Sequence, residues 1–311
     1  MQRRPLGNTG ITVSEIGLGA WQLANPDWGV RDSGDALGVV QAALDGGCDF
    51  FDTAPGYGRG RSEEVLGQAL EAVRQQVTIC TKFGHGAAGT TDFAATSLRA
   101  SLEASLRRLR TDYVDILLLH NPPPEIMDGA QAPHYYEELE RLKSEGKLRV
   151  YGVSLDSRAD LETVLATTHS GAVEVYFNIF HQEPQAAFAH AAAGGVGLIV
   201  KIPLDSGWLA GRYRAESRFS DVRDRWTPET IARRAALVEQ VAALAPPGLS
   251  LTHLALQYVL AQPEVSTVIP GAKTAAQARD NLAASAALPP ETVRALRDLW
   301  DRELKHSPLP W

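Results

Sequence analysis

The chain alternates between short runs of consecutive apolar residues and longer stretches in which apolar residues recur every three or four positions. A short apolar run bounded by turn residues is typical of a buried strand, and the longer period is typical of a helix with one face on a core. The pattern predicts eight strands, at Ile16–Gly19, Cys48–Asp52, Val77–Lys82, Tyr113–His120, Val150–Ser154, Val173–Asn178, Val196–Lys201 and Val265–Ile269.

Each predicted strand is followed by helical sequence. One clear case carries Leu98, Leu102, Leu106 and Leu109, whose spacing forms a single apolar stripe. Another begins at Ser62, with Glu63 and Glu64 in its first turn, which favours a capped helix start. The predicted helices are Gly34–Asp45, Ser62–Ala72, Ala94–Leu109, Tyr135–Glu145, Asp160–Thr168, Pro184–Ala193, Thr227–Leu244, Leu251–Gln262, Lys273–Ala284 and Pro290–Leu304.

This order of elements indicates an α/β fold. The strands are apolar throughout, so both faces of a parallel sheet are expected to be covered. No Gly-x-Gly-x-x-Gly opens a helix near the first strand, which favours a closed (β/α)8 TIM barrel over an open doubly wound sheet. Arg3–Leu6 and Ile11–Ser14 flank a Gly-Asn-Thr-Gly turn and predict an N-terminal β-hairpin. We expect one domain over residues 1–311, with an extra C-terminal helix after the barrel.

Composition narrows the classes of partner. The chain has 30 basic and 37 acidic residues, a net charge of −7, and no basic stripe, so nucleic-acid binding is not expected. No apolar run approaches the ~20 residues of a membrane span, and a cytoplasmic protein is the expectation. The two cysteines, Cys48 and Cys80, lie in apolar runs and are expected to be buried thiols rather than a redox pair or a metal site.

Four titratable residues stand at or just after strand ends. Asp52, Lys82 and His120 end the second, third and fourth strands, and Tyr57 lies in the loop after the second. In a barrel these ends meet at one mouth, which is where active sites gather. Singly, each has an ordinary structural explanation: a turn cap, a solvated lysine, a strand end, a packed ring. Together they predict a site for proton transfer.

The expected roles follow from charge. A lysine ammonium near a tyrosine stabilises the phenolate and lowers its pKa from about 10. Asp52 would keep Lys82 charged and oriented, and His120 would hold a carbonyl oxygen. With no metal-ligand cluster and no activated serine or cysteine in the pattern, hydride would have to come from a cofactor.

A second motif suggests which cofactor. Val268–Thr274 ends a strand and begins a helix, and such a helix start binds anions through backbone N–H groups. Lys273 within it is placed to pair with a 2′-phosphate, or else it stands at the start of the helix without a binding role.

These motifs resemble the aldo-keto reductases, and the resemblance covers nearly the whole chain. It is carried by Phe51-Asp52-Thr53-Ala54-x-x-Tyr57-Gly58, Thr81-Lys82-Phe83-Gly84, Asp115-Ile116-Leu117-Leu118-Leu119-His120 and Ile269-Pro270-Gly271-Ala272. The family implies a (β/α)8 barrel, NADPH bound in extended form, an aldehyde or ketone substrate, and Tyr57 as general acid in a tetrad with Asp52, Lys82 and His120.

The resemblance also implies a set of cofactor-binding positions. Lys273, Gln277 and Asn281 would hold the adenosine phosphate and adenine, as in a bacterial subgroup with a Gly-Ala-Lys/Arg loop. The loop that contains Pro203, Leu204 and Gly207 would cover the pyrophosphate, and Gly19, Ala20 and Trp21 would approach the nicotinamide. The remaining implied positions are Gly271, Asp52, Ser154, Glu174 and Lys201.

Three of these positions depart from the family pattern. Ser154 is followed by Leu155 where many members have Ser-Asn, Glu174 stands where many have glutamine, and Lys201 where many stack a tyrosine on the nicotinamide. These changes leave carboxamide recognition open, and with it NAD(H) as an alternative to NADP(H). Asn178 either replaces part of the lost hydrogen bonding or serves a turn.

Substrate choice is weakly encoded. Trp21, Trp28, Trp226, Trp311 and His85 are expected to line the mouth, with plain packing as the alternative for the tryptophans. A small carbonyl compound is the expected partner, and the oligomeric state stays open. Two other functions remain: a sugar or polyol dehydrogenase working oxidatively, and a non-catalytic NADPH-binding redox sensor, since some relatives of this fold are regulatory subunits of channels.

Overall fold

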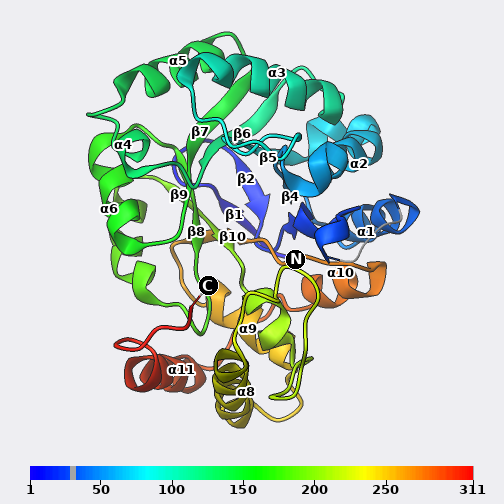
Figure 1. Ribbon diagram of the computed structural model, residues 1–311, viewed down its shortest axis with the longest axis vertical. Helices are drawn as coiled ribbons and strands as arrows, with labels where there is room; N and C mark the ends of the chain where they lie inside the picture. The colour runs from blue at the N-terminus through cyan, green and yellow to red at the C-terminus, as the bar shows by residue number, and fades with distance from the viewer. Residues whose placement is uncertain (29–32, 311) are drawn as a thin grey trace.

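Eight parallel strands form one sheet that closes into a barrel (Figure 1). The computed structural model describes residues 1–28 and 33–310. The strands, in their order around the sheet, are β3 (Leu18–Gly19), β4 (Phe50–Asp52), β5 (Thr78–Phe83), β6 (Val114–His120), β7 (Leu148–Leu155), β8 (Ala172–Tyr176), β9 (Gly197–Lys201) and β10 (Val265–Val268).

The barrel closes between its first and last strands. Gly17 N donates to Val268 O at 2.8 Å, and parallel bridges join Ile16 to Val268 and Gly19 to Gly271. The predicted eight-stranded barrel is therefore confirmed. The first strand is shorter than predicted, because its residues pair with β4 only at Leu18 and Gly19.

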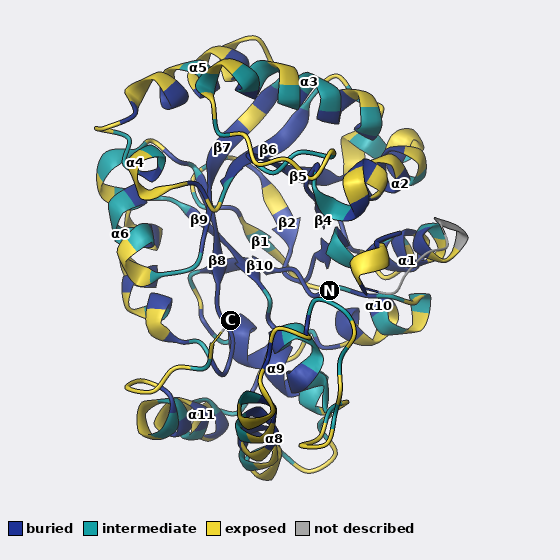
Figure 2. Ribbon diagram, viewed as in Figure 1, coloured by how far each residue is buried: buried dark blue, intermediate teal, exposed yellow. Residues whose placement is uncertain are grey.

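Helices surround the barrel with their polar faces outward, and the strands inside are buried (Figure 2). Leu98, Leu102, Leu106 and Leu109 are all buried, as the stripe predicts. Among the described residues, no helix is both long and apolar enough to cross a membrane. The helices are α1 (Ser33–Asp45), α2 (Arg61–Leu70), α3 (Leu98–Leu109), α4 (Pro124–Met127), α5 (Pro133–Ser144), α6 (Arg158–Thr167), α7 (Phe188–Ala193), α8 (Pro228–Ala243), α9 (Leu251–Leu260), α10 (Ala275–Leu282) and α11 (Pro290–Glu303).

The N-terminal hairpin closes one end of the barrel. Its strands, β1 (Arg3–Pro5) and β2 (Thr12–Ser14), pair antiparallel as predicted. Leu6, Ile11 and Val13 of this segment join an interior cluster with residues from the strands. With the amino-terminal end filled, the cavity available for chemistry lies at the carboxyl ends of the strands.

The start of α2 differs from the prediction. The helix begins at Arg61 after Gly60, which has a left-handed φ of 88°, and Ser62 makes no capping bond. Instead Ser62 Oγ donates to Ala20 O at 2.8 Å, and buried Glu63 pairs with Arg108 at 2.7 Å. Ser62 and Glu63 therefore make tertiary contacts instead of the helix-capping contacts that the local sequence predicts.

Two predicted helices are divided. The first turn of Ala94–Leu109 is the 3-10 helix Ala95–Ser97, and Pro184–Ala193 begins as the 3-10 helix Glu183–Ala187. Between β9 and α8 lies a long connection, residues 202–227, that contains only the 3-10 helix Asp205–Ala210. Its loop residues cross the open end of the barrel and contribute to the cavity described below.

Candidate active site

A cavity of about 410 Å³ opens at the carboxyl ends of the strands and extends to the start of α10. Most of the sequence-predicted site residues line it: Gly19, Trp21, Trp28, Asp52, Tyr57, His85, His120, Glu174, Lys201, Pro203, Leu204, Gly207, Gly271, Lys273, Gln277 and Asn281. Lys82 lies just beneath, while Ala20, Ser154 and Trp226 are not among the lining residues. Trp311 lies outside the described residues.

Asp52 and Lys82 form a buried ion pair on neighbouring strands. Lys82 Nζ donates to both carboxylate oxygens of Asp52 at 2.6 Å and to Thr53 O at 3.1 Å. The Lys82 side chain is 0% exposed. Burial alone lowers a lysine pKa, but the carboxylates of Asp52 and Glu174 outweigh it and raise the pKa of Lys82 well above its usual value. The ammonium is therefore permanently charged.

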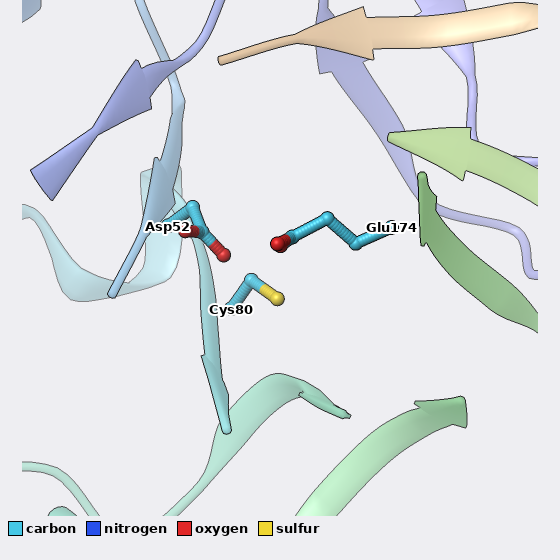
Figure 3. A group of neighbouring side chains, drawn as sticks. All are labelled: Asp52, Cys80 and Glu174. Carbon is cyan, nitrogen blue, oxygen red and sulfur yellow. The ribbon is translucent and has the colours of Figure 1, made fainter. Parts of the chain in front are cut away.

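Glu174 is a second carboxylate on the same ammonium. Its Oε2 lies 3.1 Å from Lys82 Nζ, and its Oε1 accepts from Ser154 Oγ at 3.0 Å. β4 and β8 are the second and sixth strands of the barrel order, so Asp52 and Glu174 reach the centre from opposite walls (Figure 3). The sequence analysis gives Glu174 as an implied cofactor-binding position that departs from the family pattern, and it gives no sign of this contact with Lys82.

The pKa values of the two carboxyl groups are shifted in opposite directions. Burial and the charge of Glu174 raise the pKa of Asp52 well above its usual value. Burial also opposes ionisation of Glu174, but the ammoniums of Lys82 and Lys201 outweigh it and lower its pKa. A proton taken up by the pair is therefore held on the Asp52 side.

Cys80 lies beside the same two carboxylates. The ligand atoms of Asp52, Cys80 and Glu174 lie within 4.8 Å of one another, the spacing of a candidate metal site. The positive charge between the carboxylates, however, is already supplied by the Lys82 ammonium. Burial raises the pKa of the Cys80 thiol well above its usual value, so the group is a neutral thiol and a poor metal ligand.

Tyr57 stands over this charged cluster. Lys82 Nζ lies 5.3 Å from the centroid of the Tyr57 ring, Trp21 stacks on the ring at 5.8 Å, and His120 meets it edge-on at 5.8 Å. Contrary to expectation, the pKa of Tyr57 is raised above 10. Burial is the largest cause, and the charges of Asp52 and Glu174 add to it, while Lys82 opposes them. The phenol is therefore protonated at neutral pH.

His120 is a neutral imidazole. Burial lowers its pKa well below the usual value, and the nearby charges of Lys82 and Lys201 lower it further. Its buried Nδ1 has no hydrogen-bond partner among the described residues. His85 lies 5.0 Å away, ring to ring, and also lines the cavity. A neutral imidazole beside a protonated phenol can hold and protonate an oxygen between them.

Lys201, a further departure from the family pattern, and Asn178 both make hydrogen bonds within the protein. Lys201 Nζ lies 2.9 Å from Asn121 Oδ1, Ser154 Oγ and Asp156 Oδ1. Asn178 serves a turn, because its Oδ1 accepts from the backbone N–H groups of Phe180 and His181.

The far end of the cavity is cationic. Lys273 Nζ donates to Trp28 O at 2.6 Å, and its half-buried ammonium has its pKa lowered by burial and by the charges of Arg223 and Arg212. Both arginines line the cavity and come from the connection after β9. Sequence reasoning missed them, because the part of that connection after Gly207 shows neither periodicity nor a motif. Lys273 lies just before α10, and together with Arg212 and Arg223, which also pairs with Asp221, it supplies positive charge that suits the phosphates of a dinucleotide.

Polar side chains complete that end. Gln277 Oε1 accepts from the Lys273 backbone N–H at 2.9 Å, and Asn281 Nδ2 donates to Gly271 O at 3.3 Å. Asp280, which also lines the cavity, pairs with His253 at 3.2 Å.

Only part of the expected aromatic wall is present. Trp21 and Trp28 meet edge-on at 5.0 Å and both line the cavity. Trp226 instead packs in the core, 6.2 Å from Trp208 and under the guanidinium of Arg234 at 4.4 Å. The packing alternative holds for Trp226.

Comparison with known proteins agrees with this geometry. The family model described as "Aldo/keto reductase family" matches residues 15–301. The chain is 34% identical to L-galactose dehydrogenase of Arabidopsis thaliana, over 91% of this chain and 88% of that protein. It is 29% identical to the NADH-specific methylglyoxal reductase of Escherichia coli, over 91% and 93%. Among solved structures it resembles the holo form of aldo-keto reductase AKR11C1 from Bacillus halodurans, with a TM-score of 0.82, 28% identity and 96% of each chain covered. The chain therefore belongs to the aldo/keto reductase family.

Proposed function

We propose that the chain is an NADPH-dependent oxidoreductase that reduces an aldehyde or ketone to an alcohol, with residues 1–311 acting as one domain. The observation that carries this proposal is the protonated Tyr57 phenol, which faces the cavity between His120 and the Lys82 ammonium. This is the arrangement needed to donate a proton to a carbonyl oxygen as hydride reaches the carbon.

In this proposal each side chain has one task. Tyr57 Oη donates its proton to the substrate oxygen, and the neutral His120 imidazole holds that oxygen in position. Lys82 stabilises the phenolate that remains, and Asp52 and Glu174 keep Lys82 charged and fixed through contacts of 2.6 and 3.1 Å. The bound cofactor supplies the hydride.

NADP(H) is the proposed cofactor. Lys273, with Arg223 and Arg212 nearby, supplies positive charge suited to a 2′-phosphate, and Gln277 and Asn281 lie beside it. Pro203, Leu204 and Gly207 would cover the pyrophosphate, with Gly19 and Trp21 towards the nicotinamide. NAD(H) is the alternative, and the similarity to an NADH-specific reductase makes a direct comparison of the two cofactors necessary.

The test is consumption of NADPH with nitrobenzaldehyde by the wild type and by Tyr57→Phe. The loss of a general acid should lower turnover about a hundredfold to ten-thousandfold while NADPH still binds. Phe219→Tyr in the connection after β9, a position that does not line the cavity, serves as a control aromatic exchange. Near-normal turnover in Tyr57→Phe would show that another group donates the proton.

A second candidate is a sugar or polyol dehydrogenase, supported by the similarity to L-galactose dehydrogenase. It predicts faster turnover of a sugar or polyol with NADP+ or NAD+ than of any carbonyl with the reduced cofactors. A panel of both substrate classes with all four cofactors separates these functions. Tight cofactor binding without turnover on the whole panel would favour the redox sensor instead.

A further inference from the structure

Two carboxylates at the cavity floor share one ammonium. Asp52 and Glu174 both contact Lys82, at 2.6 and 3.1 Å. The next cation, Lys201, has its own carboxylate, Asp156, at 2.9 Å. The remaining titratable groups that line this end are uncharged at neutral pH: Tyr57 is a phenol and His120 and His85 have lowered pKa values.

Glu174 is the carboxylate of the pair that keeps its charge, because burial opposes its ionisation but the ammoniums of Lys82 and Lys201 outweigh it and lower its pKa. Asp52 uses both of its oxygens on Lys82, and burial and the charge of Glu174 raise its pKa. Glu174 makes a longer single contact, lines the cavity and is 1% exposed. A glutamine in its place would fill the same volume and still accept from Ser154 Oγ, but it would carry no charge.

We propose that Glu174 strengthens binding of the oxidised, cationic nicotinamide relative to the reduced, neutral one. This inference rests on the proposed binding of a nicotinamide cofactor in the cavity. The two forms of the cofactor differ by one positive charge on the ring and share every other group. A fixed negative charge near the ring therefore changes the ratio of the two affinities rather than their common part.

The expected size follows from electrostatics in a partly buried site. Opposite unit charges within such a cavity change an affinity on the order of tenfold. A purely positioning role for Glu174, through Lys82 or Ser154, makes a different prediction. It would move the affinities for both forms together and leave their ratio unchanged.

The experiment measures dissociation constants of NADP+ and NADPH separately, by calorimetry at pH 7.5, for the wild type and Glu174→Gln. The ratio Kd(NADP+)/Kd(NADPH) should rise about tenfold in Glu174→Gln and stay near the wild-type value in Glu174→Asp, which keeps the charge. Glu15→Gln is the matched control: Glu15 is a buried glutamate paired with Arg4 at 3.1 Å and does not line the cavity.

The possible outcomes test the inference and the proposed function separately. An unchanged or lowered ratio in Glu174→Gln, with both forms still bound, overturns the inference alone. Failure of the wild type to bind either form overturns the proposed function. If Glu174→Gln does not fold, as judged by thermal melting, Glu174→Met offers a second uncharged side chain of similar length, to which the same criterion applies.

Discussion

Replacing Lys82 by methionine removes the ammonium that contacts both Asp52 and Glu174. Methionine is of similar length and apolar, so it fills the space of the fully buried lysine stem and leaves the packing largely intact. What remains is two carboxylates, buried and without a directly bonded cation. The change therefore isolates the electrostatic part of the interaction.

The expected cost is large. Removing one partner of a buried ion pair destabilises a protein by about 3–5 kcal/mol, because the other charge is left uncompensated. At about 2–4 °C per kcal/mol for a protein of this size or somewhat smaller, the melting temperature should fall by about 6 °C or more. The matched control is Lys305→Met, whose ammonium pairs with Asp301 at 2.7 Å on an exposed helix end and contributes little.

The stability that Lys82→Met loses should also depend on pH. Burial and the charge of Glu174 already raise the pKa of Asp52 in the wild type, and without Lys82 it rises further, while the lowered pKa of Glu174 rises as well. A carboxyl group whose folded pKa is raised stabilises the fold below its unfolded pKa, near 3.9, and this stability is lost as the pH rises through the folded pKa. Lys82→Met should thus lose more stability at pH 8 than at pH 5.

The assay is thermal melting followed by circular dichroism at both pH values. If Lys82→Met melts within about 1 °C of the Lys305→Met control at pH 8, the two carboxylates do not depend on Lys82, and the charge count used throughout the site is wrong. Adding Asp52→Asn to Lys82→Met should recover part of the loss, because one of the stranded charges is gone.

Three further predictions follow from individual contacts. Lys273→Met should raise KM for NADPH at least tenfold and change KM for NADH little, as steady-state kinetics with both cofactors would show, since a 2′-phosphate is a charged partner only in NADPH. Gly152→Ala should destabilise the protein severely in thermal melts, because its Cβ would lie 1.7 Å from Ala172 O, whereas Gly38→Ala in α1, which meets nothing within 4 Å, should stabilise it by about 0.5–1 kcal/mol. The raised pKa of Tyr57 keeps its proton in place as the pH rises, so carbonyl reduction should lose activity only above pH 10, and a basic limb near pH 8 in the pH–rate profile would contradict that assignment.

The sequence was sufficient for the barrel and for the placement of the strand-end residues. Both depend on features that repeat locally: apolar runs mark the strands, and parallel strands bring their carboxyl ends to one edge. Asp52, Lys82 and His120 could be placed together for this reason alone. The prediction was least accurate where local rules compete with distant partners, as at Ser62, whose hydroxyl bonds Ala20 O instead of capping α2.

The electrostatics of the site could not be predicted in the same way. The sequence indicates that Lys82 lies near Tyr57, and from that pair alone a lowered tyrosine pKa follows. The opposite direction results from burial and from two carboxylates, Asp52 and, on the far side of the barrel, Glu174. Arg212 and Arg223 were missed for a related reason, because only the fold brings the connection after β9 to Lys273.

The charge of Glu174 is one of three that act on the Tyr57 phenol, beside those of Lys82 and Asp52. Burial is the main reason that the phenol holds its proton, and the charges of Asp52 and Glu174 add to it, so a cation that enters the cavity would lower the Tyr57 pKa. Linkage is reciprocal: whatever favours the phenolate also favours the bound cation. Proton donation would thus be easiest with a neutral ring in the cavity, and proton removal from an alcohol easiest with a cationic one.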